Sequence, residues 1–479
     1  MKKIGILFLC YSLVAGLEVN APEAYESLLG NCSSNSDCSI QYVCTEGTCA
    51  HKELFPLSSL DILFTVIATF VNGLGTAGGV GEGALIIPYL ILIGKYTITK
   101  ATSLAYAIVF GGVVGNLLNI IWVSNEKDQK PLINYDINLL VIPGLLIGVP
   151  FGVVLHTVLS PSIIYGLILK TLVFFIFKIG VRLYKARKES QPQSPVLQMG
   201  SPEEIEALAP ANPQNEISVI KESYAEEDTL EKEEKVKRTL KQGQQDDKSR
   251  DLFPAEKYQE IFFIVLALVA TTFLKGSKNF ESIVGIGFCS VGYWSMDVVN
   301  VVIMSLLFLR NSSLVKKWQN QRESQGYSLS ADEIKFDNKK LLLIFALSVF
   351  AGLMGGTLSI GGALILAPFL LNWGMSPKAV VATTGFFIVF TMFSSTVETM
   401  MYGQIGSSEF VWFALINFVF SFATSRILHQ YVQKSKKENI ILLVLVIEGL
   451  ISLCMMVYLT FDLFITSYTY MKTFSSFCV

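Results

Sequence analysis

The sequence predicts an all-α polytopic membrane protein with about twelve membrane segments in two repeats of inverted topology. Glycine-broken short helices and a small disulfide-rich N-terminal segment complete this fold class. Hydrophobic residues make up 52% of the 479 positions and charged residues only 16%, against about 25% charged in a typical soluble domain. From residue 57 onward, apolar runs near the length of about 20 residues that crosses a bilayer follow one another.

The charged residues are unevenly distributed. Of the 37 basic and 39 acidic residues, 28 lie within 185–257, so the apolar remainder carries even less charge than the average suggests. A net charge of −2 gives no basic surface for nucleic acid. The chain also contains no H-E-x-x-H pair, no G-x-S-x-G elbow and no P-loop. We therefore expect neither an enzyme nor a bound cofactor or metal, and no nucleic-acid partner.

The first residues have the pattern of a secretory signal peptide. Lys2 and Lys3 precede an apolar run over 4–14, and the small residues Ala15 and Gly16 follow it. This run is too short for an ordinary membrane span. We predict a signal peptide over 1–17 and entry into the secretory pathway; a short anchor helix is the alternative.

A cysteine-rich segment follows at 18–56, which the signal peptide would place outside the cytosol. Its spacing is C-x5-C-x5-C-x4-C, formed by Cys32, Cys38, Cys44 and Cys49. Four cysteines in a small polar segment after a signal peptide predict two disulfides, with all three pairings open. A zinc site is the alternative, although it usually uses more closely spaced cysteine pairs.

The apolar runs divide into a first repeat at 57–184, a linking hairpin at 258–309 and a second repeat at 340–464, with a tail at 465–479. Two runs are short, and a glycine-rich break precedes each in matching places of the two repeats. The predicted segments are 57–76, 80–93, 99–123, 137–159, 163–184, 258–275, 283–309, 340–358, 360–373, 379–401, 410–429 and 440–464.

The polar connections set the predicted orientation. We interpret 185–257 as a charged, mostly disordered loop, because it combines prolines with a long run of charged residues. With the cysteine segment outside, counting crossings places this loop, the loop 310–339 and the basic turn 433–437 in the cytosol. Basic residues then gather on the cytosolic face, as the positive-inside rule expects.

Two stretches of the chain repeat one another. The first begins at Gly73 and reads GLGTAGGVGEGALIIPYLILIGKYTITKATSLAYA; the second begins at Gly352 and reads GLMGGTLSIGGALILAPFLLNWGMSPKAVVATTGFF. The repeats start seven segments apart, an odd number, so the second copy should be inverted in the membrane. One miscounted span would make the copies parallel instead. The matched positions are Gly81 with Gly361, Pro88 with Pro368, Gly94 with Gly374 and, after a two-residue gap, Lys100 with Lys378.

At these residues the sequence resembles the TauE/SafE family of sulfite and organosulfonate exporters. The resemblance rests on the paired glycine-rich motifs, each followed by a proline in a short helix and by a helix rich in Thr and Ser. It covers roughly 57–184 and 340–462. It implies a secondary transporter, working by alternating access, for small anions such as sulfite, sulfate or a sulfonate. The chain departs from the family pattern at Glu82, where the family tends to have glycine.

The glycine breaks are the predicted substrate site. Backbone groups freed by a helix break in a bilayer must be solvated by protein or by a wet cavity, and paired breaks can hold an anion on half-helix N-termini. The alternative is that the glycines only allow close helix packing and that the hydroxyls bond to their own helices. The candidate residues are Gly79, Gly81, Gly83, Gly361 and Gly362 at the breaks, with Thr102, Ser103, Thr383 and Thr384 on the following helices.

Ionisable residues inside apolar runs are costly and often functional. Glu82 lies in the first motif, so we consider it a candidate for coupling transport to a proton or counter-ion; capping a half-helix or pairing with a lysine are the alternatives. Asp297, Glu398 and Glu448 also lie in apolar runs, where helix-packing partners explain them as easily. A receptor or sensor that uses the cysteine-rich segment is the alternative function.

Overall fold

The structure is a computed structural model that describes residues 32–38, 41–45, 47–77, 83–121, 131–189, 255–324, 334–435, 439–466 and 477–478. The predicted signal peptide, residues 190–254 of the predicted loop, most of the tail, and Gly79, Gly81 and Glu82 lie outside these residues.

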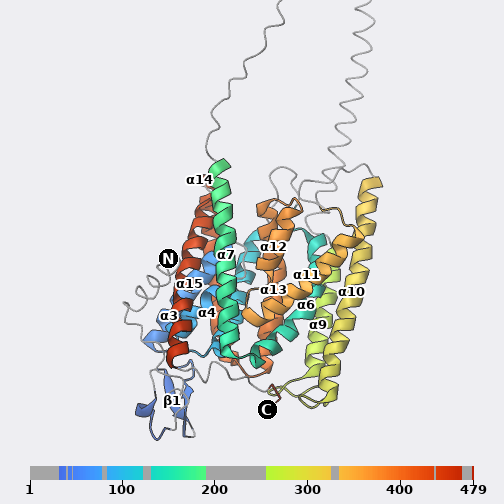
Figure 1. Ribbon diagram of the computed structural model, residues 1–479. Helices are drawn as coiled ribbons and strands as arrows, with labels where there is room; N and C mark the ends of the chain where they lie inside the picture. The colour runs from blue at the N-terminus through green and yellow to red at the C-terminus, as the bar shows by residue number, and fades with distance from the viewer. Residues whose placement is uncertain are drawn as a thin grey trace, which may run out of the picture.

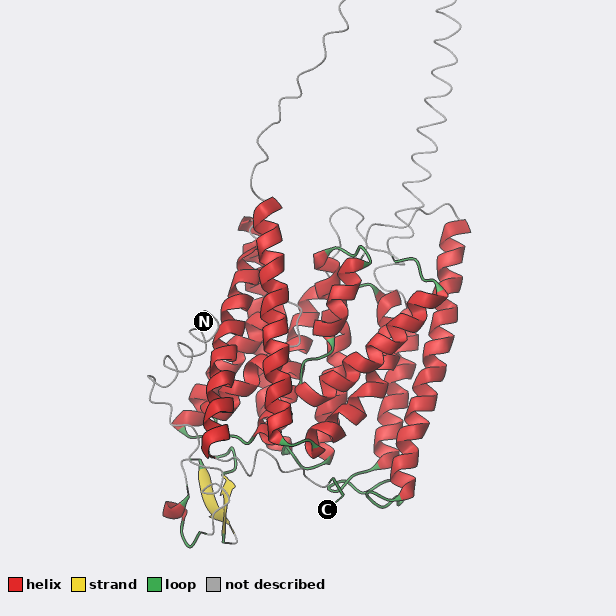
Figure 2. Ribbon diagram, in the orientation of Figure 1, coloured by secondary structure: helices red, strands yellow, loops and turns green. Residues whose placement is uncertain are grey.

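Each of the predicted membrane segments overlaps one α-helix of the described chain, and the helices form an upright bundle (Figures 1 and 2). Eight are long and apolar enough to cross a membrane. This makes the chain a multi-pass membrane protein, whereas the total of twelve segments stays a prediction. The helices are α3 (Ser59–Ala77), α4 (Gly83–Leu92), α5 (Ile98–Ile120), α6 (Tyr135–Val158), α7 (Pro161–Glu189), α9 (Ala255–Lys275), α10 (Val291–Ser324), α11 (Asn338–Leu358), α12 (Ala363–Asn372), α13 (Pro377–Met401), α14 (Ser407–Ser435) and α15 (Asn439–Thr466).

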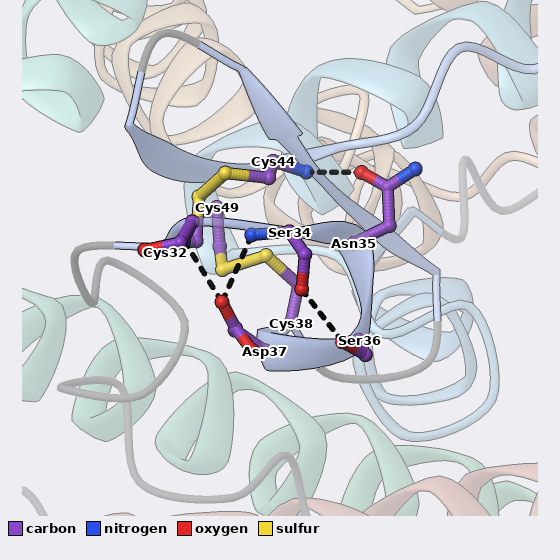
Figure 3. The surroundings of a disulfide bond; sticks show 9 residues. Cys32, Ser34, Asn35, Ser36, Asp37, Cys38, Cys44 and Cys49 are labelled. Carbon is purple, nitrogen blue, oxygen red and sulfur yellow. Dashed lines mark hydrogen bonds between the residues drawn. A yellow bond between two sulfur atoms is a disulfide. The ribbon is translucent and has the colours of Figure 1, made fainter.

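A small disulfide-bonded hairpin lies at one end of the bundle, which we call the hairpin end (Figure 1). Strand β1 (Tyr42–Thr45) pairs with β2 (Thr48–His51) in antiparallel register. One disulfide joins Cys32 to Cys44 and a second joins Cys38 to Cys49 (Figure 3). In the structure the four cysteines of this segment are thus paired with one another.

The hairpin is fixed to the bundle by polar and ring contacts. The Tyr42 hydroxyl donates to the Lys95 carbonyl at 2.9 Å, and the His51 ring stacks on Tyr96 with centroids 4.2 Å apart. Lys52 forms an ion pair with Asp61 in the first turn of α3 at 2.5 Å. The start of α3 and the turn between α4 and α5 therefore both lie at the hairpin end.

Ion pairs also mark the opposite end, which we call the Asp136 end. The Asp136 carboxylate, in the first turn of α6, lies 2.8 Å from Lys257 at the start of α9 and 2.7 Å from Arg322 near the end of α10. Lys316 of α10 donates to Asn338 at the start of α11. Helices α6, α9 and α11 therefore begin at this end, and α10 ends here.

Helices α11 and α13 run opposite to α3 and α5. The Asn134 N–H donates to Thr383 in the second turn of α13 at 3.0 Å, so α13 begins at the Asp136 end. Gln404, just after α13, accepts from Ser103 in the second turn of α5 at 2.7 Å, so α13 finishes at the hairpin end, where α5 begins. Helix α11 begins where α13 begins, just as α3 begins where α5 begins.

The halves pack through glycines. A Cβ atom on Gly111 of α5 would lie 2.1 Å from the Ala414 carbonyl oxygen of α14, and one on Gly148 of α6 would lie 2.2 Å from the Val349 carbonyl oxygen of α11. Absent side chains let the helix backbones approach this closely, as small residues do in membranes. Both interfaces join one predicted repeat to the other.

Candidate functional site

The two short helices share their length and their internal landmarks. Helix α4 begins at Gly83 and α12 at Ala363; each has ten residues, with Pro88 and Pro368 in equivalent positions. The longer helix after each short one begins with a hydroxyl cap, because Thr97 accepts from the Lys100 N–H and Ser376 from the Ala379 N–H. The two short helices therefore begin at residues that the sequence alignment of the two stretches matches.

The two breaks meet inside the bundle. A Cβ atom on Gly83 would lie 2.2 Å from both the carbonyl oxygen and the hydroxyl oxygen of Ser359, the residue that ends α11. Only a glycine permits this approach of one break to the other. The beginning of α4 therefore lies directly against the turn from which α12 begins.

The second break is a left-handed turn. Ser359, Gly361 and Gly362 have φ values of 59°, 63° and 76°, a region that costs a residue with a Cβ roughly 1–2 kcal/mol. Neighbouring side chains hold its carbonyls: Thr391 of α13 donates to the Gly361 carbonyl at 3.3 Å, and the Tyr106 hydroxyl of α5 donates to the Gly356 carbonyl. Residues of both repeats thus fix the turn.

The described residues of the site offer hydrogen-bond donors rather than full charges. The first N–H groups of a helix lack intrahelical partners and carry partial positive charge, and Gly362 caps α12 without any side-chain hydrogen bond. The Ser359 hydroxyl is fully buried and has no hydrogen-bond partner among the described residues. A buried hydroxyl without a partner, next to the start of a helix, is suited to an anion.

The four candidate hydroxyl residues do not gather at the breaks. Thr102 donates to the Ile98 carbonyl at 2.8 Å, and Ser103 donates to the Thr99 carbonyl and to Gln404, near the hairpin end. Thr384 donates to the Val381 carbonyl at 3.1 Å, and Thr383 accepts from Asn134, near the Asp136 end. The structure places Gly83 against Ser359, in the same turn as Gly361 and Gly362, and it keeps these hydroxyls in two separate pairs.

Two residues of the site are absent from the sequence-based candidates. Ser359 occupies the position that matches Gly79 when Gly81 is aligned with Gly361, so the repeat alignment contained a signal for it. Tyr106 carries no comparable signal, because its contact with Gly356 joins residues 250 positions apart.

Comparisons with known proteins agree with the resemblance noted in the sequence. The family model described as Sulfite exporter TauE/SafE matches residues 252–452. Sulfite exporter TauE/SafE family protein 5 of Arabidopsis thaliana is 26% identical over 88% of this chain and 87% of its own length. Family protein 2 of the same plant is 26% identical over 91% and 89%, and family protein 6 is 27% identical over 72% and 68%. No solved structure matches the chain.

Proposed function

We propose that this chain, which belongs to the TauE/SafE family, is a secondary transporter that moves small anions across a membrane by alternating access. Membership in a family of membrane transporters, together with the apolar helices, agrees with a multi-pass transporter rather than an enzyme. The relatives are named as sulfite exporters. Sulfite, sulfate and sulfonates are therefore the substrates that we propose.

The convergence of α4 and α12 carries the proposal. Both short helices begin at the contact between Gly83 and Ser359 and extend toward opposite ends of the bundle, so their partially positive N-termini face a common point. A site made of dipoles attracts an anion and still allows its release, as transport requires. We propose that Gly83, Ser359, Gly361 and Gly362 bind the substrate with Gly79 and Gly81. Thr102, Ser103, Thr383 and Thr384 would contact it along the path.

Alternating access requires two related halves, and the packing supports an inverted repeat. Helices α3, α5 and α6 correspond in order to α11, α13 and α14. If each helix is exchanged for its counterpart, the pair α6–α11 becomes α14–α3, and both pairs are in contact. In the same way the pair α5–α14 becomes α13–α6, and both of these pairs are also in contact. The opposite directions of α5 and α13 agree with inversion. We propose that these interfaces slide as access alternates.

We also propose that the hairpin end is extracytosolic. Its support is chemical, because Cys289, just before the start of α10 at the hairpin end, forms a disulfide with Cys478, and the hairpin itself holds two more. Disulfides persist in oxidising compartments. The Asp136 end carries Lys257, Arg322 and Lys316, as expected for a cytosolic face.

Uptake into proteoliposomes tests the function. Purified full-length protein should take up labelled sulfite, and unlabelled sulfate or methanesulfonate should compete more strongly than nitrate or lactate. Protein-free liposomes provide the baseline. Uptake no faster than in protein-free liposomes, for all three sulfur anions, would overturn the transport proposal.

A further inference from the structure

A polar cavity lies apart from the breaks, lined mainly by residues of the linking hairpin and the second repeat. It measures about 20 Å³, and its charged lining residues are Lys275 at the end of α9, Asp297 on α10 and Glu398 on α13. Their exposed fractions are only 7%, 6% and 6%. Three ionisable groups are thus enclosed within the described helices near the hairpin end.

The cavity contains one ammonium group, from Lys275, and two carboxyl groups, from Asp297 and Glu398. Lys275 forms an ion pair with Asp297 at 2.7 Å, and its ammonium lies 4.4 Å from the centroid of the Tyr293 ring. Within the described chain, the contact recorded for the Glu398 carboxylate is a long hydrogen bond of 3.4 Å from the Tyr402 hydroxyl. If both acids were ionised, the cavity would carry one uncompensated negative charge.

Elementary electrostatics indicates how that charge is neutralised. A buried carboxylate without a partner cation is costly, particularly within a membrane. A metal ion would need several oxygen ligands and would be repelled by Lys275 in the same cavity. The space holds about one water molecule. A proton on Glu398 removes the charge without needing additional space.

The cavity is connected to the breaks through two residues. Thr391 lies on the same helix as Glu398 and donates to the Gly361 carbonyl. Tyr106, which lies within electrostatic range of Glu398, donates to the Gly356 carbonyl. A change of charge on Glu398 therefore acts on a helix and a side chain that hold the second break.

We infer that Glu398 binds the proton whose movement is coupled to anion transport, while Lys275 and Asp297 set the pH at which it does so. This inference rests on the proposed transport function. The ionisable groups that face Glu398 are Lys275 from α9, Tyr293 and Asp297 from α10, Tyr106 from α5 and Tyr402 beyond the end of α13.

Coupling is tested with the full-length protein in proteoliposomes and labelled methanesulfonate, whose charge is constant between pH 5 and 8. An imposed pH gradient should accelerate net transport by the parent protein. The Glu398→Gln variant should lose this response and keep exchange of labelled for unlabelled anion. Glu260→Gln is the matched control, because it removes another buried carboxylate that pairs with Arg310 near the other end of α9; it should respond like the parent.

Two further variants should move the pH dependence in opposite directions. Asp297→Asn removes a negative charge near Glu398 and leaves Glu398 as the carboxylate that interacts with Lys275. The midpoint of the pH dependence should therefore fall. Lys275→Met leaves two carboxylates without their cation, so the midpoint should rise. The inference would be overturned if Asp297→Asn and Lys275→Met had equal midpoints. It would also be overturned if Glu82→Gln, and not Glu398→Gln, lost the gradient response, or if transport responded to sodium rather than protons.

An infrared titration tests the proton site without any substrate. Purified parent protein and Glu260→Gln should lose the C=O absorption of a protonated carboxylic acid as the pH rises, and Glu398→Gln should lack that change. A failure of transport with this signal present would contradict the proposed function alone. Transport by the parent together with an unchanged infrared titration in Glu398→Gln would contradict the proton site alone.

Discussion

At the scale of single residues, the glycines of this chain differ in what surrounds them. A Cβ atom on Gly83 would overlap the Ser359 backbone, whereas one on Gly166 of α7 would meet no atom within 4 Å. The same methyl group therefore has different consequences at the two sites. This difference can be used to test whether the breaks are the transport site.

We expect Gly83→Ala to abolish or strongly reduce transport, because the first break can no longer lie against the second. The control Gly166→Ala should transport at the parent rate, since glycine to alanine within a helix is mildly favourable where space is open. Initial uptake rates, normalised to inserted protein, provide the measurement. Parent-like transport by Gly83→Ala would show that contact between the breaks is not required.

Ser359 tests the binding of the anion itself. If its hydroxyl donates to the substrate, Ser359→Ala should weaken apparent affinity by roughly 1–3 kcal/mol. Its thermal unfolding temperature should barely change, because the hydroxyl has no hydrogen-bond partner among the described residues to lose. Ser348→Ala, on the same helix, removes a hydroxyl that already donates to the Phe345 carbonyl and should leave affinity unchanged. An unaltered concentration dependence in Ser359→Ala would exclude this contact.

At the scale of elements, a partly buried histidine contributes to the contact between the hairpin and the bundle. His51 stacks on Tyr96, and its two ring nitrogens lie 2.9 Å and 3.2 Å from the Lys52 and Gly94 carbonyl oxygens. Burial lowers the pKa of His51 below its ordinary value of 6.5, although the two carbonyls oppose the shift. The nearby charges of Lys100 and Glu409 act in opposite directions.

The pH dependence of stability follows from this shift. Because the pKa of His51 is lower in the folded protein, the unfolded chain binds the proton more readily, and stability should fall as the pH drops from 6.5 toward the folded value. His51→Phe keeps an aromatic ring against Tyr96 and should flatten this dependence. Thermal unfolding measured by intrinsic fluorescence between pH 8 and 5 tests it. An identical pH dependence in the variant would show that His51 does not set it.

Hydrogen bonds between neighbouring helices explain why α3, α5 and α14 contain buried polar residues. Asn72 of α3 donates to the Ile108 carbonyl and to Asn417 of α14, and Asn116 of α5 donates to the Thr76 carbonyl. Buried amides are stable only when such partners are present. These bonds link α3 and α5 to α14, so they hold the first repeat against the second.

At the scale of the whole molecule, the orientation can be tested with epitopes in sealed microsomes. An epitope inserted after Glu281, between α9 and α10, should be protected from added protease, because we place the hairpin end in the lumen. An epitope inserted after Ser324, at the end of α10, should be cleaved. Detergent should expose both. Protection of the Ser324 site with cleavage at Glu281 would reverse the orientation.

The charged loop gives a second test at this scale. We expect deletion of 195–250 to leave transport intact, since we interpret it as a solvated connection outside the transporting helices. Uptake rates should therefore match the parent when compared at equal insertion. Loss of transport by a correctly inserted protein would show that the loop contains a required domain.

The sequence determined the positions of the helices, because bilayer thickness sets the length of apolar runs. It also determined that α4 and α12 begin at matched residues, because glycine and proline restrict the backbone locally. It was less accurate at helix ends: α10 begins at Val291 instead of 283, after Gly285 and Cys289 adopt positive φ. The same helix continues to Ser324, since polar residues can extend a helix beyond the apolar run.

Only the tertiary structure decided which side chains meet. It paired Cys289 with Cys478 across 189 residues, placed Gly83 against Ser359, and enclosed Lys275, Asp297 and Glu398 in one cavity. It also separated Thr102 and Ser103 from Thr383 and Thr384, because α5 and α13 begin at opposite ends of the bundle. Local patterns report backbone preference and burial, whereas these contacts depend on how distant helices pack, and no local pattern contains that information.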